Sequence, residues 1–208
     1  IKGRAGVGLL SALPVIDKRY GLPGLAEDVD SGRWIEADVK TPQGYTVTVV
    51  CVYVHAGNTD DPEKMKQKYR FLDTMLVRMG QLRDEAAHGG KQAVLCGDFN
   101  IAHTPLDIKN AKANEKHAGF LPEERAYVDK WLGELEFVDV MRSLCGDIQG
   151  PYTWWSQRGR AFDNNVGWRI DYQFATPELA ETARGFVIDK APTYDLRWSD
   201  HAPLSITY

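Results

Sequence analysis

The sequence has little of several features that define whole classes of protein. It contains only three cysteines, Cys51, Cys96 and Cys145, which form neither an even set nor a CxxC pair, so we expect reduced thiols and no disulfide framework. No uninterrupted apolar run approaches about 18 residues, which excludes a membrane-spanning helix and predicts a soluble protein. No internal repeat, low-complexity tract or long linker divides the chain, so we expect a single domain over residues 1–208.

An excess of positive charge is also absent. The 25 Lys and Arg residues are outnumbered by 29 Asp and Glu residues, which leaves a formal net charge of −4. Such a chain has no global positive field that would draw it onto nucleic acid or an anionic membrane. Any nucleic-acid site must therefore be local.

Two kinds of hydrophobic periodicity are present. Short apolar or alternating runs predict strands at residues 7–10, 34–39, 46–53, 93–96, 152–155, 170–175 and 204–208. Apolar residues every three or four positions predict a helix over residues 62–87, which opens at a proline, and a second helix over residues 122–135, which opens with Pro-Glu-Glu. Many strands with few helices favour an α/β sandwich of two packed sheets flanked by helices.

One candidate for chemistry lies where a predicted strand ends. Asp98 and Asn100 follow the apolar run at residues 93–96, and their spacing of two places both on one side of an extended segment. A carboxylate and an amide that converge there could hold and deprotonate a water molecule. The alternative is an ordinary Asx-turn that closes the strand.

Two further groups stand close to the C-terminus. Asp200 and His201 are adjacent before the last predicted strand, a pairing that suits a metal ligand beside a cation that contacts phosphate. Arg169 and Asp171 share one face of a β-like run. If Asp171 had no function, it would most simply form an ion pair with Arg169, and this alternative stays open from the sequence.

Together, these groups resemble a known family. The motifs GDFN at residues 97–100, WRIDY at 168–172 and SDHAP at 199–203 occur in this order in the exonuclease III and abasic-endonuclease family. Similar blocks occupy residues 3–11, 53–54, 100–110, 119–125 and 151–155, so the resemblance covers nearly the whole chain. It implies a four-layered α/β sandwich of two packed mixed sheets flanked by helices.

The resemblance also implies an activity and a role for each motif residue. It implies a nuclease that hydrolyses phosphodiester bonds of double-stranded DNA at abasic sites and from 3′ ends. Asp98 would deprotonate the attacking water while Asn100 orients it, and Asp171 would orient His201. His201 would contact a phosphate oxygen, and Tyr53 would donate a hydrogen bond toward the scissile phosphate.

The same resemblance implies a metal and a set of DNA contacts. Mg²⁺, with Mn²⁺ as an alternative ion, would lie near Asp98, Asn100, Asp200 and His201. In the family, a further Asn and a Glu ligand lie in strands that correspond to positions before Ile1. We therefore expect this chain to lack the first strands of the fold and to hydrolyse DNA poorly by itself. DNA contacts are implied for Arg4, Asn114, Trp154 and Trp168.

Local positive charge accompanies the motifs. The residues concerned are Arg4, Lys109, Lys112, Lys116, Arg158 and Arg160. In contrast, the run Lys64, Lys66, Lys68 and Arg70 in the first predicted helix is interpreted as a solvated face. Aromatic residues such as Trp154 and Trp168 could also be plain sheet core.

Two other functions are compatible with the scaffold. Phosphoesterases that act on phosphoinositides or sphingomyelin share it, and so do non-enzymatic regulators that have lost catalytic residues. The motifs at residues 119–125 and 165–169 favour DNA over lipid. We expect a monomer without a membrane partner, cytoplasmic in a bacterium or nuclear in a eukaryote.

Overall fold

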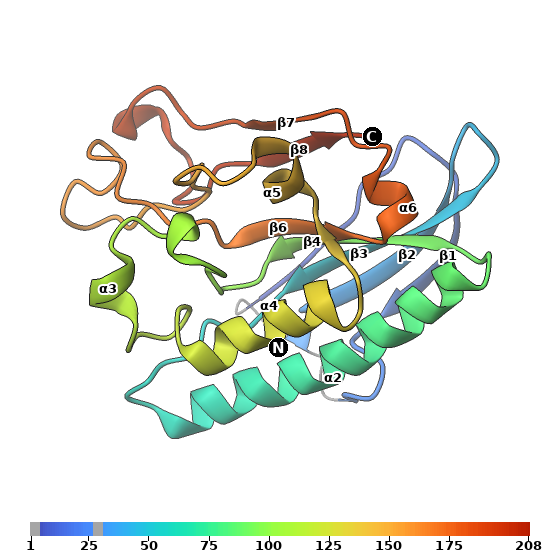
Figure 1. Ribbon diagram of the computed structural model, residues 1–208, viewed down its shortest axis with the longest axis horizontal. Coiled ribbons are helices and arrows are strands. Elements are labelled where there is room, and N and C mark those ends of the chain that lie inside the picture. Colours follow the sequence, from blue (N-terminus) through green and yellow to red (C-terminus); the bar gives the residue numbers. More distant parts are fainter. Residues whose placement is uncertain (1–4, 27–30) are drawn as a thin grey trace.

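The computed structural model describes residues 5–26 and 31–208, and a six-stranded mixed sheet is its central layer (Figure 1). The strand order is β1-β2-β3-β4-β6-β5. These strands are β1 (Val15–Tyr20), β2 (Trp34–Lys40), β3 (Thr46–Tyr53), β4 (Gln92–Asp98), β5 (Val138–Asp139) and β6 (Asp171–Ala175). A second, two-stranded sheet pairs β7 (Gly185–Ile188) with β8 (Leu204–Thr207).

The direction of the strands decides which ends meet. Strands β1, β2 and β3 form an antiparallel meander, whereas β3 and β4 are parallel. Parallel neighbours need a long crossover, and helix α2 (Pro62–Ala87) supplies it. Strand β6 then pairs antiparallel with β4. The carboxyl ends of β3 and β4 therefore lie beside the amino end of β6.

Helices and the small sheet cover opposite faces of the large sheet. Helices α2 and α4 (Pro122–Gly133) lie on one face, and β7 and β8 lie on the other (Figure 1). Within the part of the chain that the structure describes, further helical segments are η1 (Pro105–Asp107), α3 (Ala111–Asn114), α5 (Val140–Cys145), α6 (Pro177–Ala180) and η2 (Tyr194–Leu196). Two packed sheets flanked by helices confirm the α/β sandwich expected from the sequence.

Helix α2 has the predicted bounds, but the side chains that it buries differ slightly from the predicted ones. Asp61 caps it by accepting from the Lys64 N–H, and Pro62 occupies its first turn. Its buried side chains include Phe71, Leu72, Met75, Met79 and Leu82. Among the residues that made the pattern, Met65, Tyr69 and Leu76 are only half-buried. The main core lies between this helix, α4 and the large sheet.

Three expectations are wrong. Residues 7–10 form no strand, and Leu10 is fully exposed, because no described segment pairs with them. Residues 152–155 form only isolated bridges, since their amides bond to Trp168 and Asp200 on separate segments. Lys68 belongs to no solvated face, because its side chain is completely buried in an ion pair. Lys64 and Lys66 are exposed as expected.

All three cysteines are free thiols, and Cys51 and Cys96 are register partners on β3 and β4. Over residues 5–26 and 31–208, no helix combines the length and the apolar character needed to cross a bilayer.

The packing of α2 leads to a stability prediction. Phe71→Ala should lower the free energy of unfolding by about 3–5 kcal/mol, because the ring is fully buried between the helix and the sheet. Val77→Ala on the same helix should change it little, since that side chain is 63% exposed. Urea unfolding of both variants checks the prediction, and equal midpoints would contradict the packing.

Candidate active site

Three adjacent strands place polar side chains in one row at the end of the large sheet. Tyr53 is the register partner of Asp98 across β3 and β4, and Asp98 is the register partner of Asp171 across β4 and β6. Register partners point to the same face of a sheet. Three segments that are far apart in the sequence thus bring a phenol and two carboxylates together.

The turn after β4 fixes the orientation of Asp98. Gly97 has a φ of +141°, and a Cβ there would lie 1.9 Å from the Val52 carbonyl oxygen, so only glycine fits. Asn100 donates its backbone N–H to Asp98 Oδ1 (2.8 Å) and its Nδ2 to Asp98 Oδ2 (3.0 Å). The Asx-turn considered as an alternative is therefore present, and the turn itself presents the Asp98 carboxylate.

The two carboxylates face a shared histidine. Nδ1 of His201 lies 2.9 Å from Asp171 Oδ2, and its Nε2 lies 4.0 Å from Asp98 Oδ2. Burial lowers the pKa of His201, but the hydrogen bond and charge of Asp171 outweigh burial and raise the pKa above its usual value. Burial and the nearby Asp171 charge raise the pKa of Asp98 to about 7.

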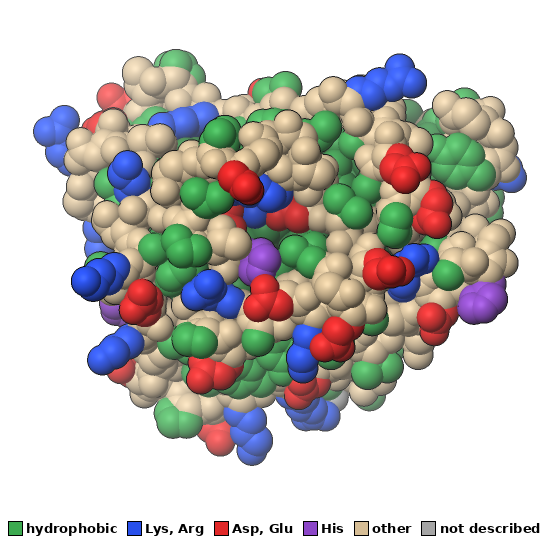
Figure 2. All heavy atoms as spheres, viewed as in Figure 1, with side chains coloured by type: hydrophobic (Ala, Val, Ile, Leu, Met, Phe, Trp, Pro, Cys, Tyr) green, Lys and Arg blue, Asp and Glu red, His purple; other side chains and the backbone are tan. Residues whose placement is uncertain are grey.

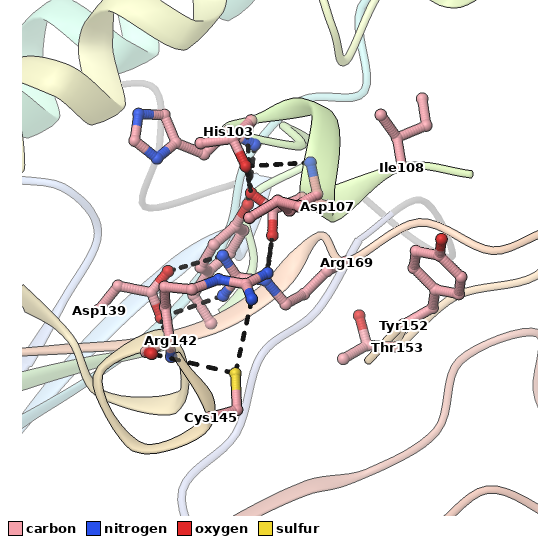
Figure 3. A network of polar contacts seen from close by, with 12 residues as sticks. His103, Asp107, Ile108, Asp139, Arg142, Cys145, Tyr152, Thr153 and Arg169 are labelled. Carbon is pink, nitrogen blue, oxygen red and sulfur yellow. Dashed lines mark hydrogen bonds and ion pairs between the residues drawn. The ribbon is translucent and has the colours of Figure 1, made fainter. Parts of the chain in front are cut away.

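Arg169 is not the partner of Asp171. Its guanidinium is buried and donates to Asp107 Oδ1 (2.7 Å) and Asp139 Oδ1 (3.0 Å) (Figure 3). Arg142 donates to the same oxygen of Asp107. The structural alternative for Asp171 is therefore wrong, because Arg169 is occupied by two other carboxylates. Instead, the network anchors the residues that lead into β6.

Asp200 is held by an indole. Nε1 of Trp154 donates to Asp200 Oδ2 at 3.0 Å, and the Trp155 N–H donates to the Asp200 carbonyl at 3.0 Å. Trp154 also forms isolated bridges with Trp168 and His201. The sequence did not suggest this role for Trp154, because its partner lies 46 residues away.

A cavity of about 480 Å³ collects most of the expected site residues. Its walls include Tyr53, Asp98, Asn100, Asn114, Trp154, Trp168, Asp200 and His201. Asp171 lies directly behind His201. The indoles of Trp154 and Trp168 meet edge to face at 6.0 Å, and both are half-buried, whereas Trp155 is core. Arg4 lies outside the described residues.

The donor set suits a hard cation only in part. Asp98, Asn100 and Asp200 offer the oxygen ligands that Mg²⁺ prefers. However, in the described ranges no three His, Cys, Asp or Glu side chains group as a metal centre. Both Asp98 oxygens accept from Asn100, and one Asp200 oxygen accepts from Trp154. The metal role of the four expected ligands thus stays a prediction.

The sequence did not predict the buried ion pair and hydrogen bonds that hold the loops around this cavity. Lys68 and Glu124 form a fully buried ion pair that touches the loops around Asn100 and Gly119. Thr153 Oγ1 accepts from the N–H groups of Ile170 and Asp171. No local pattern signals these contacts, because each partner comes from a distant segment.

Comparison with known proteins agrees with the geometry. A model of the endonuclease/exonuclease/phosphatase family matches residues 1–201. The chain is 33% identical over 205 residues to an exodeoxyribonuclease of Bacillus subtilis, covering 99% of this chain and 75% of that one. An AP endonuclease from Archaeoglobus fulgidus superposes with a TM-score of 0.81 at 31% identity, covering 95% of this chain and 72% of the other.

A second solved structure is similar to the same extent. It is a 3′ phosphatase from Neisseria bound to a product DNA hairpin, with a TM-score of 0.82, 29% identity and coverage of 95% of this chain and 72% of that one. The chain therefore belongs to the endonuclease/exonuclease/phosphatase family and groups within it with the exodeoxyribonucleases and AP endonucleases.

Proposed function

We propose that this protein is a Mg²⁺-dependent nuclease that hydrolyses phosphodiester bonds of duplex DNA at abasic sites and at 3′ ends. The observation that carries the proposal is the convergence of Tyr53, Asp98, Asn100 and His201 on one cavity, with Asp171 bonded to the histidine. The relatives named as exodeoxyribonuclease and AP endonuclease support the substrate class.

Asp98 is the proposed general base. Its carboxylate is oriented by two hydrogen bonds from Asn100. Its pKa of about 7 allows a substantial fraction to accept a proton from water near neutral pH. A bound Mg²⁺ would supply electrostatic stabilisation of the negative charge that develops on the phosphate.

His201 and Tyr53 are the proposed phosphate contacts. The carboxylate of Asp171 favours the protonated imidazole, so the His201 ring can donate from Nε2 into the cavity. Tyr53 borders the same cavity and can donate its phenolic O–H. Fixed donors of this kind stabilise charge that grows in the transition state without reorganising.

The cavity wall suits a sugar without a base. Trp154 and Trp168 form a half-buried aromatic corner, and Gly119 lies against Trp168, where a Cβ would approach the indole to 3.1 Å. An apolar slot of this kind accepts a bare deoxyribose that has left the helix and excludes one that carries its base. The basic residues that accompany the motifs in the sequence, Lys109, Lys112, Lys116, Arg158 and Arg160, are all exposed.

These cations offset the acidic net charge locally. Lys and Arg side chains protrude along the edge of the molecule near α3, at the left of Figure 2. Such side chains can contact phosphates without reading sequence. Binding should therefore be sensitive to salt and insensitive to base sequence.

A substrate comparison tests the proposal directly. Because this chain is expected to hydrolyse DNA poorly by itself, the protein is used in excess over the duplex. With Mg²⁺ present, a duplex with one abasic analogue should be nicked slowly, and a duplex with an ordinary nucleotide there should not be nicked. Excess EDTA should stop the reaction, and a phosphoinositide should not be hydrolysed. Cleavage of the lipid without cleavage of DNA would overturn the proposal.

Replacement of the proposed base gives a second prediction. Asp98→Asn should reduce the single-turnover rate on abasic duplex by about 10²-fold or more, because an amide cannot accept the proton from water. Asp147→Asn, at an exposed position away from the cavity, is the matched control and should cleave normally. A near-normal rate for Asp98→Asn would remove Asp98 from the role.

Mutation distinguishes a tryptophan that lines the cavity from one that belongs to the core. Trp168→Ala should lower cleavage at abasic sites with a small change in melting temperature, because the indole lines the cavity. Trp155→Ala should instead cost about 3–5 kcal/mol of stability, since that indole is only 2% exposed. Thermal unfolding beside nicking assays distinguishes them. A large drop in melting temperature with normal specific activity for Trp168→Ala would refute the sugar-pocket role.

A further inference from the structure

A lysine is buried directly beneath the wall of the cavity. The Lys68 side chain, on α2, has no exposed surface. Its Nζ donates to the carbonyl oxygens of Ala56 (3.1 Å) and Asn100 (2.9 Å) and forms an ion pair with Glu124 Oε1 at 2.6 Å. The ammonium thus binds the loop that follows β3, the loop that follows β4 and helix α4.

Glu124 extends these contacts to a third loop. Its side chain is also fully buried, and its second oxygen, Oε2, accepts from the N–H groups of Gly119 (2.6 Å) and Leu121 (3.0 Å). Gly119 packs against Trp168 on the cavity wall. The pair therefore connects two helices to all three loops that form this side of the cavity.

The backbone conformation of Asn100 directs its polar groups to two different partners. Its φ is +50°, in the left-handed region that Asn adopts more readily than most residues other than glycine. In this conformation its carbonyl accepts from Lys68 while its N–H and its side chain reach Asp98. Asn100 thus contacts both Lys68 and the proposed general base, Asp98. A hydrogen bond that fixes the Asn100 carbonyl therefore also restricts the position of the Asp98 carboxylate.

A buried ion pair is by itself weak evidence of a gain in stability. Burial lowers the pKa of Lys68, and the charge of Glu124 opposes this shift. Buried ion pairs lose much of their attraction to desolvation, and apolar replacements of similar size are often neutral or stabilising. The exposed pair Lys64–Asp61, one turn earlier on α2, involves no such desolvation.

We propose that Lys68 and Glu124 are a pair of positioning residues for the active site. They touch no reacting atom. They hold the carbonyls of Ala56 and Asn100 and the amides of Gly119 and Leu121 so that Asp98 and the Trp168 wall keep the geometry that cleavage needs. The inference rests on the proposed nuclease function for its kinetic part, and on the contacts alone for its structural part.

The test removes both charges at nearly constant volume. Lys68→Met combined with Glu124→Gln should leave the melting temperature within a few degrees of that of the parent chain. The single-turnover rate at saturating abasic duplex should fall at least about tenfold, while the dissociation constant of the duplex should change less than about twofold. Hydrogen exchange should accelerate in residues 99–102 and 117–121 and stay unchanged in the strands.

A control and a second variant keep the result interpretable. Lys66→Met removes one charge from an exposed position of the same helix, where the side chain is 76% exposed, and should alter none of these measurements. If the double variant does not fold, Lys68→Met alone should show faster exchange in the loop of Asn100 and the same loss of rate, because Glu124 keeps its bonds from the Gly119 and Leu121 amides and no buried cation is left unpaired.

The outcomes separate the inference from the proposed function. Unchanged rate and unchanged local exchange in a folded variant would overturn the inference. A uniform rise in exchange with a large fall in melting temperature would also overturn it, because the pair would then be merely structural. If the parent chain cleaves no DNA, the proposed function fails, whereas the exchange measurement still decides whether the pair holds the loops.

Discussion

The antiparallel pairing of β4 with β6 is the constraint on which the site depends. It places the carboxylates of Asp98 and Asp171 opposite each other at the end of the sheet. Like charges in such a position are unfavourable unless other groups compensate for them. Asn100 and His201 provide that compensation, Asn100 through hydrogen bonds to Asp98 and His201 through a hydrogen bond to Asp171. The polar chemistry of the cavity follows from this juxtaposition.

Buried charges hold the loops that surround this pair. Arg169 bonds Asp107 and Asp139 on one side, and Lys68 bonds Glu124 on the other. A similar network joins Arg78 of α2 to Glu36 on β2. These ion pairs are directional, so they specify one arrangement of irregular backbone where apolar packing would allow several. The site thus combines the ends of three strands with loops that buried ion pairs hold in place.

Much of the fold and the site was predictable from local patterns. Periodicity correctly predicted α2, α4 and the strands β2, β3, β4, β6 and β8, because each element shows a continuous run of side chains with one spacing. It missed β1, β5 and β7, and it wrongly assigned strands to residues 7–10 and 152–155. A strand forms only where a partner supplies hydrogen bonds, and a local pattern contains no information about the partner.

The sequence by itself determined which chemical groups are available: the carboxylates, amide, imidazole and indoles of the motifs, and the scarcity of positive charge. The tertiary structure decided which of them act together. In the structure, Asp171 bonds to His201 rather than to its neighbour Arg169, and Asp200 bonds to the Trp154 indole. Lys68 is buried, although Lys64 and Lys66 on the same helix are exposed. The physical reason is that burial and charge pairing depend on segments far apart in the chain, and only the packed molecule brings these segments together.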